Sequence, residues 1–409
     1  MSDTSAESIR AERLNGIELS LIVRIQERAN ALRAEGVDII GLGTGEPDFD
    51  TPEHIKEAAV QAMRDGVTKY PPTAGSAALK EAVCAKFERE NNFVYAADEV
   101  MVSTGAKQVL FNAMMATVNP GDEVIVLAPY WGVYADIVRM VGGVPKILSC
   151  PASDGFLLQP EALEAAITPK TRWLMLNSPS NPSGACYGPA EWGGLIEVLD
   201  RHPHVWLLSD DIYEHLVYDG QRYAHPLAIQ PALRERTVLV NGVSKAYAMT
   251  GWRIGYAAGP KALIGAMTAV QGHVTSGASS ISQAASVAAL NGPQEIVAER
   301  RDIFQERRDS IVAALNEAPG IDCLMPDGAF YVLPSCAGVL GGRAPSGDVI
   351  DSDLTFCQYL LDTQGVAVVP GTDFGAPNHF RISYAYARDA LIEAARRIKV
   401  ACETLEFDA

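Results

Sequence analysis

Seven short apolar runs separated by amphipathic stretches occupy residues 98–259, and they constrain the fold more than any other feature of the chain. The runs are DEVMVSTG (98–105), EVIVLAP (123–129), VPKILSC (144–150), RWLMLNSP (172–179), VWLLSDD (205–211), TVLVNG (237–242) and RIGYAAG (253–259). Strands that are apolar along their length are buried on both faces, so the pattern predicts a mostly parallel sheet covered by helices on both sides. Ligand sites in such sheets form at the carboxyl ends of the strands.

The chain is long enough for two domains, because its 409 residues exceed what one hydrophobic core normally supports. After Pro293 the pattern changes to an α+β arrangement. Its predicted elements are a charged helix at 295–318, strands within 328–334, 366–370 and 380–385, and a helix from about Asp389. We predict an N-terminal arm and part of the small domain in residues 1–50, a large domain in 51–293 and a small domain in 294–409.

Composition excludes several functions. A net charge of −17 argues against a nucleic-acid surface, which needs a basic face. Neither a secretory signal nor an apolar run of about 18 residues is present, so no membrane association is predicted. The seven cysteines form no C-x-x-C pair and the histidines form no ligand pattern. We therefore expect no metal site and no disulfide framework, and a reducing, cytoplasmic location.

A lysine stands in a segment built for burial. Between Leu239 and Gly259 the only charged residues are Lys245 and Arg253. A buried ammonium lowers its pKa or finds a counter-charge, and a lysine in such a place is often a nucleophile or a Schiff-base former. The alternative is a lysine that reaches the surface along its methylene stem.

Other polar residues follow the predicted strands. Gly105 joins a strand to a helix, and the free N–H groups of such a helix start attract a phosphate. Lys107 in the first turn opposes the helix dipole, which makes more sense with an anion nearby. Asn181 and Asp210 follow two further strands, with Tyr213 three residues after Asp210. A cofactor with a phosphate, a basic ring nitrogen and an aldehyde would use all of these groups, and pyridoxal 5′-phosphate (PLP) is such a cofactor.

The glycine-rich stretch IIGLGTGEPDFDTP (39–52) does not fit a dinucleotide-binding loop. Its glycines are spaced G-x-G-x-G, and Pro47 and Pro52 prevent the helix that must open at the third glycine. A turn that lets a small ligand approach the backbone fits better.

The segment GVSKAYAMTGWRIG (242–255) matches the cofactor-attachment motif of a known family. The motifs GEPDF, KYPPTAG, NPSG, SDDIYEHL, GAFY and FRISYA occur in the order and spacing of the same family. From about residue 13 to its end the chain resembles the class I PLP-dependent aminotransferases of fold type I, most closely the bacterial aspartate aminotransferases. The resemblance implies a large domain with a mostly parallel seven-stranded sheet and a smaller α+β domain.

The resemblance also implies roles around the cofactor ring. Lys245 would hold PLP as a Schiff base and, once displaced by the substrate amine, would move the proton at the substrate Cα. Asp210 would pair with the pyridinium nitrogen. Tyr213 and Asn181 would hydrogen-bond the phenolic oxygen of the ring, and Trp131 would stack on it.

Further residues are implied for the phosphate. Gly105, Ala106 and Arg253 would hold it, with Arg253 as a bidentate fork and Ser244 contributing a hydroxyl. Tyr70 in KYPPTAG would reach the phosphate of a neighbouring subunit. The resemblance therefore implies a homodimer with sites at the subunit interface.

The implied substrate groups are two carboxylates. Arg381 would bind the α-carboxylate beside the Gly45 backbone, and Trp131 and Asn181 would also contact the substrate. Lys107 would bind the distal carboxylate of aspartate or glutamate, although the residues alone also allow Lys107 to be a simple neighbour of the phosphate cradle.

One segment departs from the family pattern. Relatives usually carry K-P-S-A near the N-terminus, whereas this chain has IELSLI (17–22), with Glu18 and Leu19 in place of Lys-Pro and only Ser20 matching. That departure argues against prephenate as an acceptor and, more mildly, against a strict aspartate preference. Small residues in TSGASSISQ (275–283) leave room for larger side chains.

The sequence favours a ping-pong aminotransferase with aspartate or glutamate as donor and 2-oxoglutarate as acceptor. The alternatives are an aromatic or broad-range aminotransferase, a PLP β-lyase or synthase, and a non-catalytic PLP-binding regulator. Regulators of this build carry an added helix-turn-helix domain, whereas only about forty residues precede GTGEPDF here.

Overall fold

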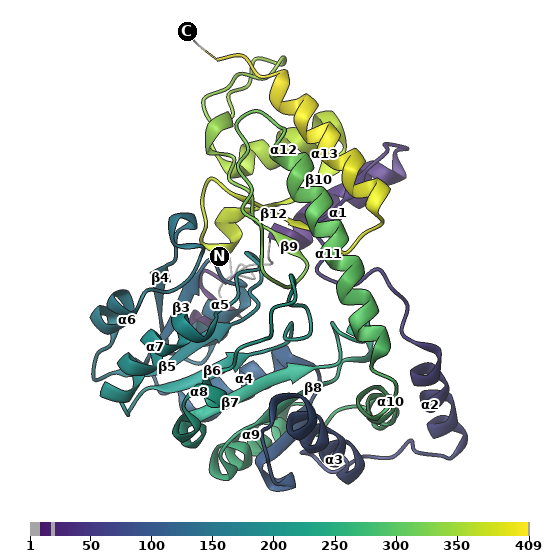
Figure 1. Ribbon diagram of the computed structural model, residues 1–409, viewed down its shortest axis with the longest axis vertical. Coiled ribbons are helices and arrows are strands. Elements are labelled where there is room, and N and C mark those ends of the chain that lie inside the picture. The colour runs from purple at the N-terminus through teal and green to yellow at the C-terminus, as the bar shows by residue number, and fades with distance from the viewer. Residues whose placement is uncertain (1–8, 18–20, 408–409) are drawn as a thin grey trace, which may run out of the picture.

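The computed structural model describes residues 9–17 and 21–407 and contains a central seven-stranded sheet (Figure 1). The spatial order of the strands is β2-β8-β7-β6-β5-β3-β4. Their bounds are β2 Val100–Ser103, β3 Glu123–Ala128, β4 Val144–Ser149, β5 Thr171–Asn177, β6 Trp206–Asp210, β7 Thr237–Gly242 and β8 Gly255–Ala258. Each strand falls within or beside one of the seven predicted runs. The predicted fold class is confirmed.

The sheet is mixed but mostly parallel. Only β8 is antiparallel to its neighbours β2 and β7, and the remaining pairs are parallel. The register places Asn177, at the end of β5, beside Asp210, at the end of β6. Polar side chains from neighbouring strands therefore meet at one edge of the sheet, as strand-end residues do in parallel sheets.

Alternation along the strands assigns side chains to two helical layers. Val124 and Val126 of β3 pack in one apolar cluster, whereas Ile125 packs in the other. The first layer comprises α4 Ala106–Thr117, α5 Val133–Met140 and α9 Lys261–Val274. The second comprises α2 Glu53–Arg64, α3 Ala77–Lys86, α6 Pro160–Ala166, α7 Pro189–Arg201, α8 Pro226–Ile229 and α10 Ser280–Asn291. Both faces of the sheet are thus buried, which explains the apolar runs.

The C-terminal part builds a second core. Its elements are α11 Glu295–Leu315, β9 Tyr331–Val332, α12 Asp353–Gln364, β10 Val366–Ala367, β11 Val369–Pro370, β12 Phe380–Ser383 and α13 Arg388–Glu403. Strands β11, β12 and β9 form an antiparallel sheet. The long helix α11 runs from beside α10 up to α12 and α13 (Figure 1). Its side chains Phe304, Ile311 and Leu315 pack in this second core.

The N-terminal segment lies against that C-terminal part. Strand β1, Ile40–Gly41, pairs in parallel with β10. Helix α1, Leu21–Ala34, shares an apolar cluster with α12, in which Ala29 lies with Leu361 (Figure 1). This arrangement supports the predicted division at residues 50 and 293, which stays a prediction. Among the described residues, no helix combines the length and apolar character needed to cross a membrane.

Candidate active site

A cavity of about 310 Å³ lies at the carboxyl ends of the central strands. Strand ends β5 and β6, the start of α4 and the segment after β7 form most of its wall, and the small antiparallel sheet contributes Tyr331 and Arg381. Eleven of the thirteen predicted site residues line this cavity: Gly45, Ala106, Lys107, Trp131, Asn181, Asp210, Tyr213, Ser244, Lys245, Arg253 and Arg381. The remaining two are Gly105 and Tyr70.

Lys245 is a half-buried amine inside this cavity. Its Nζ donates a hydrogen bond to the carbonyl oxygen of Gly45 at 2.5 Å and lies 5.9 Å from the centre of the Tyr213 ring. Burial lowers the pKa of Lys245 to about 8. A substantial fraction of this amine is therefore neutral and nucleophilic at mildly alkaline pH.

Asp210 places a buried carboxylate opposite that amine. It ends β6, and its Oδ2 accepts a hydrogen bond from the Tyr134 hydroxyl at 2.7 Å. Burial raises the pKa of Asp210 to about 7. A protonated ring nitrogen placed here would gain a strong ion pair and would keep the carboxylate ionised.

Arg381 presents an incompletely satisfied guanidinium. Its Nη1 donates to Asn181 Oδ1 at 3.0 Å and its Nη2 to the Gly43 carbonyl oxygen at 2.5 Å. Its Nε is buried and has no hydrogen-bond partner among the described residues. A buried donor of this kind normally finds an acceptor, and a substrate carboxylate supplies one in the planar geometry that arginine prefers.

Two positive side chains, Arg253 and Lys107, lie at the start of α4. Gly105 has φ 84°, and a Cβ there would lie 2.3 Å from Arg253 Nη2. A Cβ on Gly255 would lie 2.2 Å from the Ala106 nitrogen. The two glycines thus let the Arg253 guanidinium and β8 approach the helix start closely. With Lys107 nearby, this cradle suits a dianionic phosphate.

Arg253 is more exposed than its apolar segment suggested, and the pKa of Lys107 is shifted. Arg253 stands in an apolar segment, yet its side chain is exposed in the single chain and donates to the Thr250 carbonyl oxygen at 2.9 Å. Lys107 Nζ lies 4.7 Å from the centre of the Trp131 ring. Partial desolvation and the charge of Arg253 lower the pKa of Lys107.

Tyr70 stands apart from the cavity, with 92% of its surface exposed. Because the sequence placed it at the site of a neighbouring subunit, the single chain does not test that role. Gly45 lies beneath Tyr331, where a Cβ would be 2.4 Å from the tyrosine oxygen.

Sequence reasoning missed several cavity residues. Tyr331 shares a 2.8 Å hydrogen bond with Tyr213 through their hydroxyls, and Asn177 donates to the Asp210 carbonyl oxygen at 2.8 Å. Tyr134 lies three residues after Trp131, which is the spacing of one helical face. That spacing could have revealed Tyr134, and the GAFY motif contained Tyr331 without a role assigned to it.

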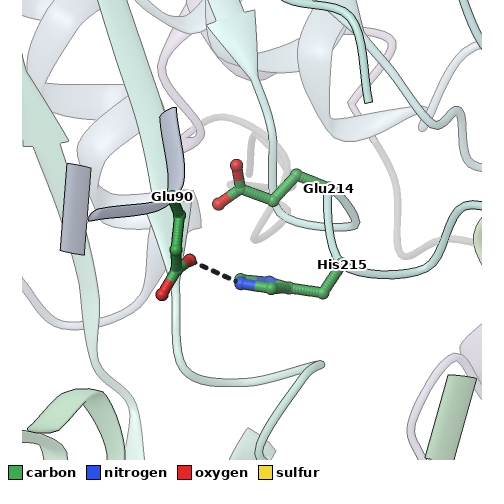
Figure 2. Close-up of side chains that lie close together, drawn as sticks. All are labelled: Glu90, Glu214 and His215. Atoms are coloured by element: carbon green, nitrogen blue, oxygen red, sulfur yellow. Dashed lines mark hydrogen bonds and ion pairs between the residues drawn. The ribbon is translucent and has the colours of Figure 1, made fainter. Parts of the chain in front are cut away.

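Glu90, Glu214 and His215 form a separate cluster whose ligand atoms lie within 4.8 Å of one another (Figure 2). Such a trio can hold a metal ion. The Lys86 ammonium, however, already lies against it, in an ion pair with Glu214 and 3.5 Å from Glu90 Oε2. The cluster therefore carries its own cation.

Fold and cavity together define an enzyme of the PLP-dependent type, with a lysine, a buried carboxylate and a phosphate cradle around one cavity. Residues 37–398 match the family model described as aminotransferase class I and II. The chain belongs to this family. It is accordingly a PLP-dependent enzyme that transfers amino groups between amino acids and 2-oxo acids, as the sequence predicted.

Named relatives span nearly the whole chain. The aspartate aminotransferase of Rhizobium meliloti strain 1021 is 58% identical over 97% of this chain and 96% of its own length. A probable aspartate/prephenate aminotransferase of Rhizobium leguminosarum bv. phaseoli is 52% identical over 96% of this chain and 98% of its own. The predicted resemblance to bacterial aspartate aminotransferases is confirmed.

Solved structures of aspartate aminotransferases have the same fold as this chain. The crystal structure of the aspartate aminotransferase from Rhizobium meliloti superposes with a TM-score of 0.95 at 57% identity, covering 97% of this chain and 99% of that one. The Thermus thermophilus aspartate aminotransferase with maleate superposes with a TM-score of 0.88 at 41% identity, covering 96% and 99%.

Proposed function

We propose that this aminotransferase takes the amino group of aspartate or glutamate and delivers it to a 2-oxo acid such as 2-oxoglutarate by a ping-pong cycle. The observation that carries the proposal is the pair of cations at one cavity, Arg381 and Lys107. An amino acid with two carboxylates can pair with both cations, whereas an aromatic donor leaves Lys107 without a partner. The names of the Rhizobium relatives give independent support.

The residues divide the work within the cavity. PLP supplies an aldehyde and an electron-accepting ring. Lys245 would bind that aldehyde and later take and return the proton at the substrate Cα. Asp210 would hold the ring nitrogen in its protonated form, and Tyr213 and Asn181 would donate to the ring oxygen. The Trp131 side chain, which lines the same cavity, would stack on the ring.

A second group of residues anchors the ligands. The backbone N–H groups at Gly105 and Ala106 hold the phosphate together with Arg253 and Ser244. Arg381 binds the α-carboxylate beside the Gly45 backbone and so orients the substrate Cα towards the Lys245 amine. Orientation of this kind is a large part of catalysis in such enzymes.

We further propose a homodimer in which Tyr70 completes the phosphate site of the partner. Helix α2 and the loop after it expose apolar side chains for which the single chain provides no cover: Val60 at 38%, Met63 at 50%, Val67 at 45% and Tyr70 at 92%. Exposed apolar side chains gathered on one short segment support an interface at that segment. A cytoplasmic location is also proposed, and the seven free cysteines support it.

The first test is a half-reaction. The PLP-loaded protein is mixed with single amino acids in the absence of an acceptor, and the change of the cofactor absorption is followed. Rapid change with aspartate and glutamate but not with phenylalanine is expected. Change mainly with phenylalanine would replace the dicarboxylate assignment with an aromatic one. Release of ammonia together with a 2-oxo acid would instead indicate a β-lyase, and no change with any amino acid would indicate a binding protein.

Prephenate is a second candidate acceptor, because relatives about half identical to this chain are named aspartate/prephenate aminotransferases. The departing residues Glu18 and Leu19, and the matching Ser20, lie outside the described residues. The amine-loaded enzyme should return to its starting absorption with 2-oxoglutarate but slowly with prephenate. Equal rates with both acceptors would show that the departure does not exclude prephenate.

A further inference from the structure

The turn that carries Tyr213 separates two cavities. Tyr213 lines the catalytic cavity, whereas the next two residues, Glu214 and His215, line a second cavity of about 660 Å³. Tyr213 and Glu214 therefore line different cavities, and the turn that carries them is the wall between the two. Because open space lies behind this wall, hydrogen bonds and ion pairs must contribute to its position as well as close packing.

Glu214 is the centre of those contacts. Its side chain is 5% exposed and accepts hydrogen bonds from Lys86 Nζ, from Asn91 Nδ2 at 2.8 Å and from Asn241 Nδ2 at 2.5 Å. Burial alone would raise the pKa of Glu214, but the Lys86 ammonium, His215 and the donated hydrogen bonds together outweigh it, and the pKa of this carboxyl is lowered. The carboxylate is therefore ionised and held by three donors from two segments, the end of α3 with the turn that follows it and strand β7.

The donors connect Glu214 to the attachment lysine. Asn241 lies in β7, and its Oδ1 accepts the Gly242 N–H at 2.7 Å, three residues before Lys245. Lys86 ends α3, is fully buried and also donates to Asn91 Oδ1 at 2.8 Å. One carboxylate thus ties the Tyr213 turn to the strand that leads into Lys245.

A second hydrogen bond, between His215 and Glu90, lies on the outer side of the same turn. His215 Nε2 and Glu90 Oε2 are 2.9 Å apart (Figure 2). These side chains are only partly buried, at 18% and 22% exposure. A partly exposed pair contributes less than a buried one with several donors, so Glu214 is the stronger of the two attachments.

We propose that Glu214, held by Lys86, Asn91 and Asn241, is a positioning residue that fixes the Tyr213 hydroxyl relative to the Lys245 amine. The inference rests on the proposed function, because its importance lies in the contact that Tyr213 makes with the cofactor. A fully donor-bound buried carboxylate is rigid, and the loss of one partner leaves charges and dipoles without compensation. Displacement of Tyr213 then weakens its hydrogen bond to the ring oxygen.

The test uses Glu214→Gln in the PLP-loaded enzyme. The readout is the pH midpoint of the cofactor absorption, which reports the proton on the nitrogen linking Lys245 to the cofactor. A weaker Tyr213 hydrogen bond should raise this midpoint by about one unit, a tenfold change in proton affinity. Removal of a negative charge acts in the opposite direction, because it disfavours the protonated nitrogen. A rise therefore reports positioning, whereas a fall or no change would overturn the proposal.

A double-mutant cycle tests whether the effect passes through Tyr213. In a Tyr213→Phe background, Glu214→Gln should add no further rise, because the hydrogen bond is already absent. An equal rise in both backgrounds would show that Glu214 acts by another route. Failure of wild-type enzyme to react with aspartate would reject the proposed function, while this cycle would still judge the positioning role.

A charge-free double variant and a matched control distinguish an effect on stability from an effect on the position of Tyr213. Lys86→Met with Glu214→Leu removes both buried charges and should restore the melting temperature of the cofactor-free protein towards wild type. The pH midpoint of the cofactor absorption should stay raised in this double variant. If the midpoint returned to the wild-type value, the Lys86–Glu214 pair would have a role in stability only. Glu123→Gln is the control. Glu123 also accepts from three donors, Lys146, Thr168 and Thr171, but lies at the opposite ends of the strands, so only the melting temperature should change.

Discussion

Asp210 and Lys245 face one cavity, and burial shifts their pKa values in opposite directions, which raises that of the acid and lowers that of the amine. In both groups burial disfavours the charged form, so the cofactor-free cavity has an unfavourable desolvation free energy that a bound ligand reduces. The cofactor offers each group what it lacks: a cationic ring nitrogen for the carboxylate and an aldehyde for the amine. This complementarity predicts that the cofactor stabilises the folded chain and changes the pH dependence of its stability.

The pH dependence can be predicted from Asp210. In the cofactor-free chain its pKa is raised from 3.8 to about 7, so the folded state binds this proton more tightly than the unfolded state. The resulting stabilisation is complete below the ordinary pKa and is lost as the pH rises through about 7. Asp210→Asn should remove this dependence, which is worth on the order of 4 kcal/mol over that range. Urea unfolding at several pH values measures it.

Two controls isolate that effect from other titrating groups. Asp65→Asn, at an exposed position after α2, should leave the pH dependence of the wild type in place. PLP should abolish the dependence in the wild type, because the ring nitrogen keeps Asp210 ionised. Parallel curves for wild type and Asp210→Asn without cofactor would contradict the assignment.

We propose that Lys107 determines the preference between donors. Its amine lies beside the Trp131 ring at the catalytic cavity, where it can reach a distal carboxylate. Lys107→Ala should raise the KM for aspartate roughly tenfold to a hundredfold, the effect of losing one hydrogen bond to a charged group. The KM for phenylalanine should change little. Steady-state kinetics with both donors measures the ratio.

The matched control for Lys107 is Lys170→Ala, an exposed lysine beside β5 on the amino side of the sheet. It should change neither KM. If Lys107→Ala raises both KM values equally and weakens cofactor binding, Lys107 belongs to the phosphate cradle instead, which is the alternative that the sequence left open.

At the scale of elements, the approach of β8 and Arg253 to the start of α4 depends on glycine. Gly105→Ala places a Cβ against the Arg253 guanidinium and forces a residue into positive φ. We expect a loss of about 1–3 kcal/mol in stability from strain. Cofactor affinity should also fall, by roughly tenfold or more, because the guanidinium must leave the phosphate cradle. Absorption titration with PLP and urea unfolding measure the two effects.

Gly121→Ala is the control that separates the effect of backbone strain from the effect of displacing Arg253. Gly121 has φ 86°, similar to the 84° of Gly105, but a Cβ there meets nothing within 4 Å. It should lower stability to a similar extent and leave cofactor affinity unchanged. An equal loss of affinity in both variants would show that strain alone, and not the position of Arg253, governs binding.

Elements with strong periodicity were predictable, and contacts between distant elements were not. The seven strands of the sheet follow from apolar runs because burial on both faces leaves few polar positions, although the edge strand β4 is partly exposed and includes Lys146. Strand β1 has two residues, too few for any pattern, and the one strand predicted within 366–370 is divided in the structure into β10 and β11. The predicted helix 295–318 ends at Leu315 in the structure, because the end of a helix is the part of it that sequence patterns fix least well.

The candidate site was predictable where a motif fixes the local backbone. Lys245 and Asp210 carry signals in their own segments, a cation in an apolar run and an acid at a strand end. The Tyr134–Asp210 and Lys86–Glu214 contacts join residues 76 and 128 positions apart, and neither partner reveals the other. Only the folded chain shows that such side chains meet.

At the scale of the whole molecule, one chain does not complete the predicted phosphate site. Tyr70 is exposed and absent from the cavity, and the apolar surface beside it continues along α2. A second copy of the chain would cover that surface and deliver a tyrosine to the phosphate of its partner. The proposal makes a strict prediction about mixed dimers, since the attachment lysine and the shared tyrosine of one site then belong to different subunits.

Mixed dimers of Lys245→Ala and Tyr70→Ala subunits distinguish sharing from local use. If Tyr70 acts across the interface, each mixed dimer has one site that lacks both residues and one that keeps both. Two inactive preparations, unfolded and refolded together with PLP, should then regain roughly a quarter of wild-type activity, since about half the dimers are mixed and each has one intact site. If Tyr70 acts within its own subunit, no site is intact and mixing restores nothing. Light scattering on the mixture confirms the dimeric mass, and a monomeric mass would overturn the shared site directly.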